Sequence, residues 1–328
     1  MIDPPPAQFD LGLGAWILST YADVSAALHN PRLSASGNAD ASAQMQWSFR
    51  ESASRALSPQ RVTHWRAAID DTAVRCAAAL VFDQPVDLVS AFAGPFSREV
   101  AALVSGVSLP EAARLAAPAS DVFLAAAFAS SADAQPDTHR SLVALSRALT
   151  GPDPTIAVQS FVALSHTLPC VLAAAWLALM HDHEVMHQLR TTPSLMPRVA
   201  DELLRVASTS RAVFRRAAAS VRIGEADIRA GESVILMLTA ANHDPAQFPD
   251  PMRVDLTRGA VGHLALGSGV HPCLGASLVR IAVTCATTAL LAATTRIELV
   301  GAVEWLDGFA IRAPVTLPVA LRSVHGVR

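Results

Sequence analysis

Apolar side chains recur at helical spacing over most of the chain, chiefly as alanine and leucine every three or four positions. The stretch from Phe161 to Met180 is apolar nearly all round, which is typical of a helix buried at the centre of a large domain. A polar break over 130–137 interrupts one of the other helical segments. Further helices are predicted over 22–29, 48–80, 86–107, 110–150, 194–206 and 274–294.

Strand patterns are confined to short segments, which we place over 16–21, 219–238 (with a Gly-Glu-Ala-Asp turn) and 297–321. Residues 33–46 and the proline-rich 244–251 read as loops. No segment has the composition of an interdomain linker, and no repeat is visible. We therefore predict one mainly α domain with small β-sheets over residues 1–328.

The composition supports a large folded core. Apolar residues make up 52% of the 328 residues, charged residues only 16%, and the mean hydropathy is +0.35, which excludes a disordered chain. The net charge of −3 argues against nucleic acid as a partner.

Two features bear on the compartment. The start of the chain is acidic and proline-rich, unlike an export signal, and Ser165, His166, Thr167 and Pro169 interrupt the one long apolar run. The four cysteines have no metal-finger spacing and do not read as a disulfide framework. We expect a soluble cytoplasmic protein with no membrane segment.

The strongest chemical signal is Leu266-Gly-Ser-Gly-Val-His-Pro-Cys-Leu-Gly275, just before a predicted helix. Gly267 permits a tight turn, and Gly275 allows close approach of the backbone. Cys273 stands at a helix N-terminus, where free N–H groups stabilise a thiolate, and a lone thiolate suits an axial position on heme iron. The alternative, a buried inert cysteine, suits Cys76, Cys170 and Cys285 better.

This segment resembles the heme loop of the cytochrome P450 superfamily, FGxGxHxCxG, with Leu266 in place of phenylalanine. The resemblance extends over nearly the whole chain and implies a P450-like fold with heme b. It also implies a chain shortened at the N-terminus and in the distal lid, so that the edge of the heme is open.

Two further segments carry the resemblance. Glu202-Leu-Leu-Arg205 looks like the ExxR motif, and the segment 248–253 looks like the meander that supplies a second arginine, here Arg253. An i,i+3 Glu/Arg pair is usually a solvated helix face, but beside the cysteine loop a buried triad is favoured. Its expected role is to hold the fold under the heme.

By the same resemblance, Arg215, His271 and Arg50 would bind the two heme propionates. Arg50 ends a family pattern in which Gln46 replaces histidine, and a plain surface arginine remains the alternative for it.

The distal helix departs from the family pattern AGxxTT. Thr167 occupies the position of the threonine whose hydroxyl assists proton delivery in the family. His166 replaces the usual acidic residue, and Leu164 replaces the glycine that makes room for dioxygen. A core helix that tolerates a histidine is the alternative. Pro169 removes a helix hydrogen bond to Ser165, so a kink is predicted here.

The resemblance implies a P450-like oxidoreductase, most simply a monooxygenase, that tailors a small organic molecule in secondary metabolism. Electrons would come from a ferredoxin or a flavoprotein. The altered distal motif leaves open a peroxide-driven reaction or a non-redox rearrangement. A non-catalytic heme-binding module is a third hypothesis.

Overall fold

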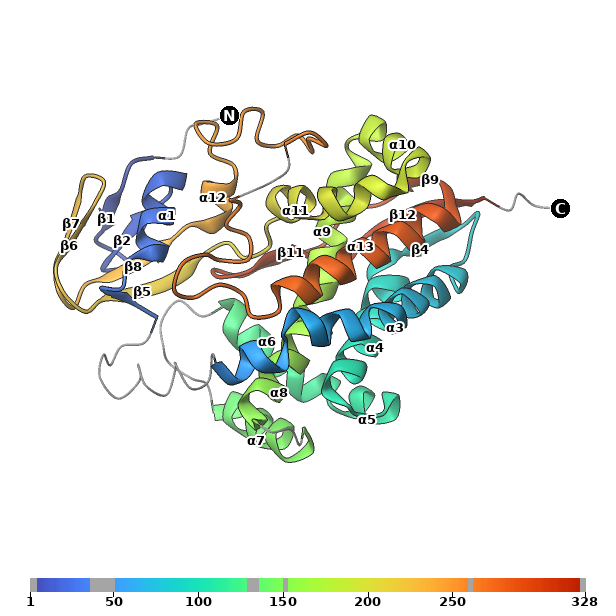
Figure 1. Cartoon of the computed structure of the whole chain (residues 1–328), viewed down its shortest axis with the longest axis horizontal. Helices are drawn as coiled ribbons and strands as arrows, with labels where there is room; N and C mark the ends of the chain where they lie inside the picture. The colour runs from blue at the N-terminus through green and yellow to red at the C-terminus, as the bar shows by residue number, and fades with distance from the viewer. Residues whose placement is uncertain (1–4, 36–50, 129–135, 150–152, 259–261, 325–328) are drawn as a thin grey trace.

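The computed structural model describes residues 5–35, 51–128, 136–149, 153–258 and 262–324, and it is mainly helical, as predicted (Figure 1). A short helical segment over 51–56 precedes the helix that begins at Pro59. The helices are α1 (Tyr21–His29), α3 (Pro59–Ala78), α4 (Gly94–Ser105), α5 (Leu109–Arg114), α6 (Ala116–Phe128), α7 (Pro136–Ala148), α8 (Pro154–Val162), α9 (Leu168–Met180), α10 (His183–Thr191), α11 (Met196–Val206), α12 (Leu238–Asn242) and α13 (Ala276–Ala293).

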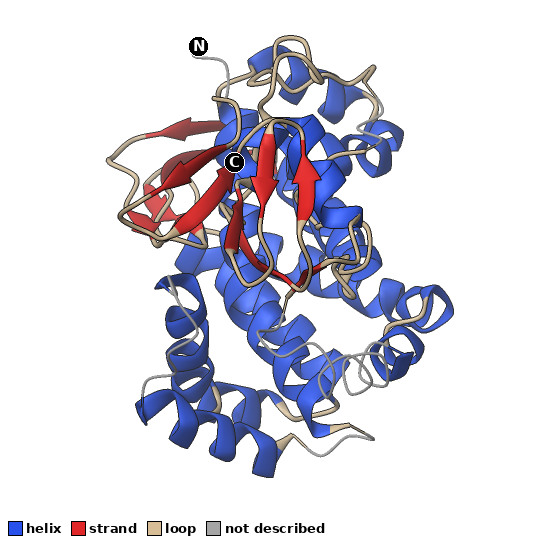
Figure 2. Ribbon diagram, turned by 90° about the vertical axis from the view of Figure 1, so that its left-hand side faces the viewer, coloured by secondary structure: helices blue, strands red, loops and turns tan. Residues whose placement is uncertain are grey.

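The strands form small sheets that gather on one side of the helices (Figure 2). The largest sheet has the order β1-β2-β8-β5-β3, in which only β2 and β8 run parallel. A second has the order β4-β12-β9, and β6-β7 and β10-β11 are hairpins. The strands are β1 (Gln8–Asp10), β2 (Ala15–Leu18), β3 (Leu33–Ser34), β4 (Pro85–Asp87), β5 (Val213–Ala217), β6 (Val221–Ile223), β7 (Ala226–Ile228), β8 (Ser233–Leu236), β9 (Thr294–Leu299), β10 (Trp305–Asp307), β11 (Arg312–Pro314) and β12 (Pro318–Ser323).

The predicted central helix is part of one long helix made of α8, a π turn over Ala163–Thr167, and α9. The kink expected near Pro169 takes the form of this π turn, in which the Leu168 N–H bonds the Ala163 carbonyl. In α9, the Trp176 indole N–H donates to Thr287 Oγ1 of α13 at 3.1 Å. Helices α9 and α13 thus pack on each other in the core.

Two helices, Pro154–Met180 and Ala276–Ala293, are long and apolar enough to cross a membrane by length and composition alone. They are 61% and 50% buried inside the molecule. Burial of this kind is also what a core helix of a soluble domain shows, so the two helices are weak indicators of a membrane protein.

Several boundaries differ from the sequence-based prediction for local reasons. The single helix expected over 48–80 is interrupted because Ser58 accepts a capping bond from the Arg61 N–H and Pro59 starts a new helix. Strand β4 replaces the expected helical start at Val86, where it pairs with β12. Helix α10 was missed; Asp182 caps it.

Candidate functional site

The cysteine loop turns sharply at two glycines. Gly267 and Gly269 both have φ of +66°, as predicted for a tight loop. A Cβ on Gly269 would lie 2.3 Å from the Leu28 carbonyl oxygen at the end of α1, so the loop lies directly against that helix. The Cys273 N–H donates to the Leu266 carbonyl at 2.7 Å and closes the turn.

Cys273 precedes α13, whose first residue is Ala276. The Cys273 residue is exposed, whereas Cys76, Cys170 and Cys285 are buried. Desolvation by the surrounding protein raises the pKa of the Cys273 thiol. A hydrogen bond from the Gly275 N–H and the charge of Arg280 act in the opposite direction but are weaker. The helix start alone therefore does not make a thiolate of Cys273, whereas metal coordination would deprotonate it.

Gly275 has an ordinary backbone conformation, and a Cβ there would meet only Cys273 Sγ, at 4.0 Å. The predicted close approach is therefore not to another part of the protein. Gly275 faces the cavity beside Cys273.

The predicted Glu202–Arg205 pair is completely buried, with two 2.8 Å bonds between the guanidinium and the carboxylate. The prediction that Arg253 completes this triad is wrong. The Arg253 side chain is exposed, and only its carbonyl accepts a bond from Arg205, at 3.2 Å. The second arginine is Arg258, whose Nε lies 3.5 Å from Glu202 Oε1.

Arg253 follows the meander prolines most closely, which is why it was the candidate. The structure instead turns the chain at Asp250, whose φ is +48°, so that the carbonyls of Pro251 and Arg253 point at Arg205. Five residues after Arg253, the side chain of Arg258 lies against the Glu202 carboxylate.

Asn242 connects this buried pair with the cysteine loop, and sequence reasoning missed it. Its carbonyl accepts from Arg205 at 2.7 Å, and its side-chain oxygen accepts from the Leu264 N–H at 2.6 Å. A polar residue just before Asp244-Pro245 in an apolar helix was the available signal.

A second polar cluster lies beside the loop. Asp201 accepts from His263 Nε2 at 3.0 Å and from Arg280 Nε at 2.6 Å. Burial tends to raise the pKa of Asp201, but these two hydrogen bonds and charges lower it overall. The cluster ties α11, the loop and α13 together under Cys273.

Two cavities meet at Cys273. We call them the apolar cavity, about 290 Å³, and the polar cavity, about 250 Å³. The residues lining both are Thr167, Val171, Pro272, Cys273 and Val279. The thiol thus lies at the junction of the two spaces, opposite Thr167 of the long helix.

The polar cavity contains two of the predicted propionate ligands. Arg215 of β5 and His271 of the loop both line it, with the run Ser208-Thr209-Ser210. Arg215 is buried, and one of its N–H groups donates to the Phe214 carbonyl at 2.8 Å. Arg50, the third predicted ligand, lies outside the described residues.

The apolar cavity contains two of the three predicted distal residues. Leu164, 5% exposed, and Thr167 both line it, from the π turn. Thr167 Oγ1 makes no hydrogen bond with the residues that the structure describes. Its hydroxyl is therefore available toward the space over Cys273.

His166 faces another direction. It is not among the described residues that line either cavity, and its ring lies 5.8 Å from that of Phe123 in α6. The Ser165 hydroxyl donates to the Phe161 carbonyl at 2.7 Å, so His166 Nδ1, 2.8 Å from that hydroxyl, must be the donor. Desolvation, and then the Arg98 charge, lower the pKa of His166, which keeps the ring neutral at pH 7.

Comparison with known proteins is consistent with this geometry. The Cytochrome P450 family model matches residues 172–293, from α9 to α13, which includes Glu202, Arg205 and Cys273. Cytochrome P450 107B1 of Saccharopolyspora erythraea is 28% identical over 94% of this chain and 89% of its own length.

Mycinamicin IV hydroxylase/epoxidase of Micromonospora griseorubida is 40% identical, over 43% of this chain and only 37% of its own length. CYP109B1 of Bacillus subtilis has the same fold, with a TM-score of 0.83 at 22% identity, covering 96% of this chain and 95% of its own. The chain is thus similar to cytochromes P450 in sequence over 94% of its length and in fold over 96%.

Proposed function

We propose that the protein is a heme b enzyme that oxidatively tailors a small organic molecule, with Cys273 as the axial ligand of the iron. The observation that carries this proposal is the junction of the two cavities at Cys273. The apolar cavity is lined mainly by apolar side chains, whereas the other cavity also carries Arg215, His271 and the run Ser208-Thr209-Ser210. A flat apolar ring with two carboxylates at one edge fits such a space.

In this proposal Val171, Val279 and the backbone at Gly275 would hold the apolar part of the ring beside Cys273. Arg215 and His271 bind the propionates at the polar end, as donors to carboxylate oxygens. Leu266, which lines the polar cavity, keeps water from the thiolate. The bound heme supplies one-electron and dioxygen chemistry tuned by its thiolate ligand.

On the other side of the ring, the Thr167 hydroxyl passes a proton at Oγ1 toward the reacting centre. Leu164 excludes water from the same space. His166, neutral and turned toward Phe123, positions the π turn and acts on Thr167 only through the backbone.

The partners follow from this chemistry. The substrate is a small organic molecule, and a ferredoxin or flavoprotein donates electrons in the cytoplasm. Two relatives, the mycinamicin IV hydroxylase/epoxidase and a nocardicin C N-oxygenase of Nocardia uniformis, are named for oxidations of mycinamicin IV and nocardicin C, which favours a role in secondary metabolism.

The proposal is tested on the ligand. The reduced protein with carbon monoxide should show the red-shifted absorbance band of a thiolate-bound heme, and Cys273→Ser should abolish it. Cys76, Cys170 and Cys285 are buried and line neither cavity at Cys273, so these thiols cannot reach the proposed site. Serine at those three positions should leave the band unchanged, and an unaltered band in Cys273→Ser would overturn the proposal.

A second candidate function rests on Leu164. Its side chain occupies space beside Thr167 where dioxygen would bind, which favours a peroxide-driven reaction or a non-redox rearrangement. Turnover measured with reductase and dioxygen, with peroxide alone, and with neither separates the three chemistries. In a dioxygen-driven enzyme, Leu164→Gly should raise the product formed per electron; in the alternative it should lower the native rate.

A further inference from the structure

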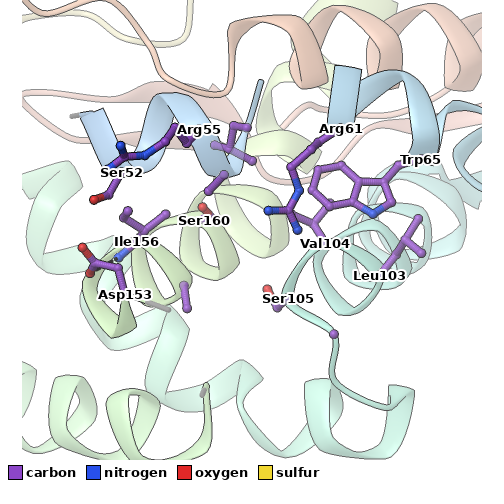
Figure 3. A pocket seen from close by; sticks show the side chains of 14 residues that line it. Ser52, Arg55, Arg61, Trp65, Leu103, Val104, Ser105, Asp153, Ile156 and Ser160 are labelled. Atoms are coloured by element: carbon purple, nitrogen blue, oxygen red, sulfur yellow. Dashed lines mark hydrogen bonds between the residues drawn. The ribbon is translucent and has the colours of Figure 1, made fainter. Parts of the chain in front are cut away.

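A third cavity, about 570 Å³ and larger than either cavity at Cys273, lies outside the predicted site. We call it the outer cavity. It lies between the helical segment 51–56 with the start of α3 on one side and the end of α4 and the start of α8 on the others (Figure 3). Nothing in the proposed heme site uses it.

Cationic side chains stand on one side of the outer cavity. Arg61 extends into it beside the ring of Trp65 and above Ser105, as Figure 3 shows. Within the described part of the chain, the Arg61 guanidinium makes no ion pair and no hydrogen bond. Arg55 pairs with Glu51 at 3.1 Å, but both side chains are about two-thirds exposed, so this pair is weak.

The single carboxylate in the wall does not neutralise Arg61. Asp153 lies across the cavity from Arg61 (Figure 3), and it accepts hydrogen bonds from the backbone N–H groups of Thr155 and Ile156 at the start of α8. The Ser105 hydroxyl oxygen is buried and has no hydrogen-bond partner among the described residues. The wall near Arg61 thus offers an unpaired cation and an unused hydroxyl to an anion.

The remaining wall is apolar and leads toward Cys273. Leu57, Ile156 and Ser160 line both the outer cavity and the apolar cavity, so the two spaces share one wall. Leu103 and Val104 of α4 and the Trp65 ring add apolar surface on the outer side. The outer cavity is therefore adjacent to the space under Leu164 and Thr167.

We propose that the outer cavity binds the carboxylate end of an elongated, apolar organic acid whose other end reaches the space over Cys273. The inference rests on the proposed function and narrows its substrate class. Arg61 binds the carboxylate, Arg55 adds a second positive charge at the mouth, and the shared wall guides the apolar body inward. A neutral end group would form no ion pair with Arg61, which is exposed, and a cationic one would be repelled by it.

Two probes of equal length test the charge requirement. Decanoate and decan-1-ol are titrated into the heme-loaded protein by calorimetry. Decanoate should bind more tightly than decan-1-ol. Arg61→Gln should weaken the affinity for decanoate about tenfold, because a charge-assisted bond is lost, and should change the affinity for decan-1-ol little. Arg66→Gln is the matched control, since Arg66 is an exposed arginine on the same helix that does not line the cavity. Equal binding of the two probes, or an equal effect of the two substitutions, would overturn the proposal.

The reach toward Cys273 is tested by length. Hexanoate, decanoate and dodecanoate should all depend on Arg61, but only the longer acids should shift the heme absorbance. Arg61-dependent binding with no spectral shift at any length would make the outer cavity a separate site and overturn the proposal, leaving Cys273 ligation intact. Failure of the carbon monoxide test would instead refute the heme proposal, while the calorimetry still reports on Arg61.

Discussion

The two sides of Cys273 are built from different interactions. Below the thiol, Glu202, Arg205 and Asn242 form a fully buried network of hydrogen bonds of 2.6–2.8 Å that fixes the loop backbone. Above it, the long helix presents Leu164 and Thr167 from a π turn held largely by apolar packing and one Ser165 hydroxyl bond. Directional bonds hold one arrangement, whereas apolar packing tolerates substitution.

This difference explains where the chain keeps and where it leaves the family pattern. Gly269 has a positive φ and lies against Leu28, and Glu202 and Arg205 pair inside the core, so few other residues would satisfy the geometry at these positions. The distal positions only need to fill space and leave Thr167 free. A leucine and a histidine are therefore accommodated there without disturbing the helix.

The largest effect should follow from breaking the network below the thiol. Glu202→Gln leaves Arg205 buried without a charged partner, and we expect a loss of about 3–5 kcal/mol in the free energy of unfolding. Glu51→Gln, in the exposed pair with Arg55, should change it by no more than about 0.5 kcal/mol. Urea denaturation of both variants measures this contrast, and similar losses would show that the buried network is not what holds the lower side.

Truncating one leucine on each side sharpens the comparison. Leu203 is fully buried beside Glu202. The loss in the free energy of unfolding for Leu203→Ala should therefore lie in the upper part of the range of about 2–5 kcal/mol. Leu164 already borders a cavity, so Leu164→Ala creates less new surface and should fall near the lower end. Equal losses in denaturant melts would contradict the view that the upper side is loosely packed.

The two glycines of the loop should respond differently to alanine. In Gly269→Ala the new Cβ would meet Leu28 at φ of +66°, and we expect a loss of about 1–3 kcal/mol in thermal or urea unfolding. Gly275→Ala has no such contact, so the heme-free protein should keep its stability while heme uptake, followed by absorbance titration, weakens. A stable Gly269→Ala variant would show that the loop does not depend on its contact with α1.

Sequence reasoning reached the mainly α fold, the central helix and the cysteine loop because these depend on local spacing and on residues that stand close together in the chain. It chose Arg253 over Arg258 because which arginine faces Glu202 depends on the path of the chain after Asp250, which no local pattern encodes. It missed Asn242, whose only local sign was a polar residue at the end of an apolar helix. It placed His166 one residue from Thr167 without revealing that the π turn directs the two side chains differently.

The smallest expected effect concerns two histidines, one on each side of Cys273. Desolvation lowers the pKa of His166 above the thiol and of His243 below it, where the Arg205 charge acts in the same direction and a bond to the Val206 carbonyl opposes it. The folded protein then binds fewer protons than the unfolded chain, in which histidine titrates near pH 6.5. Stability from these groups is complete above about pH 6.5 and is lost as the pH falls through that value toward their lower folded pKa values.

Urea denaturation of the heme-free protein at pH 7.5, 6.5 and 5.5 should therefore show declining stability toward acid. His166→Gln and His243→Gln should each make the decline shallower, and the double variant shallower still, since the sites are far apart and their effects should add. His183→Gln, a change at an exposed position on α10, should leave the slope unchanged. A slope unaltered in His166→Gln alone would mean that the packing of His166 against Phe123 does not exclude water, and that the upper side is looser still than its contacts indicate.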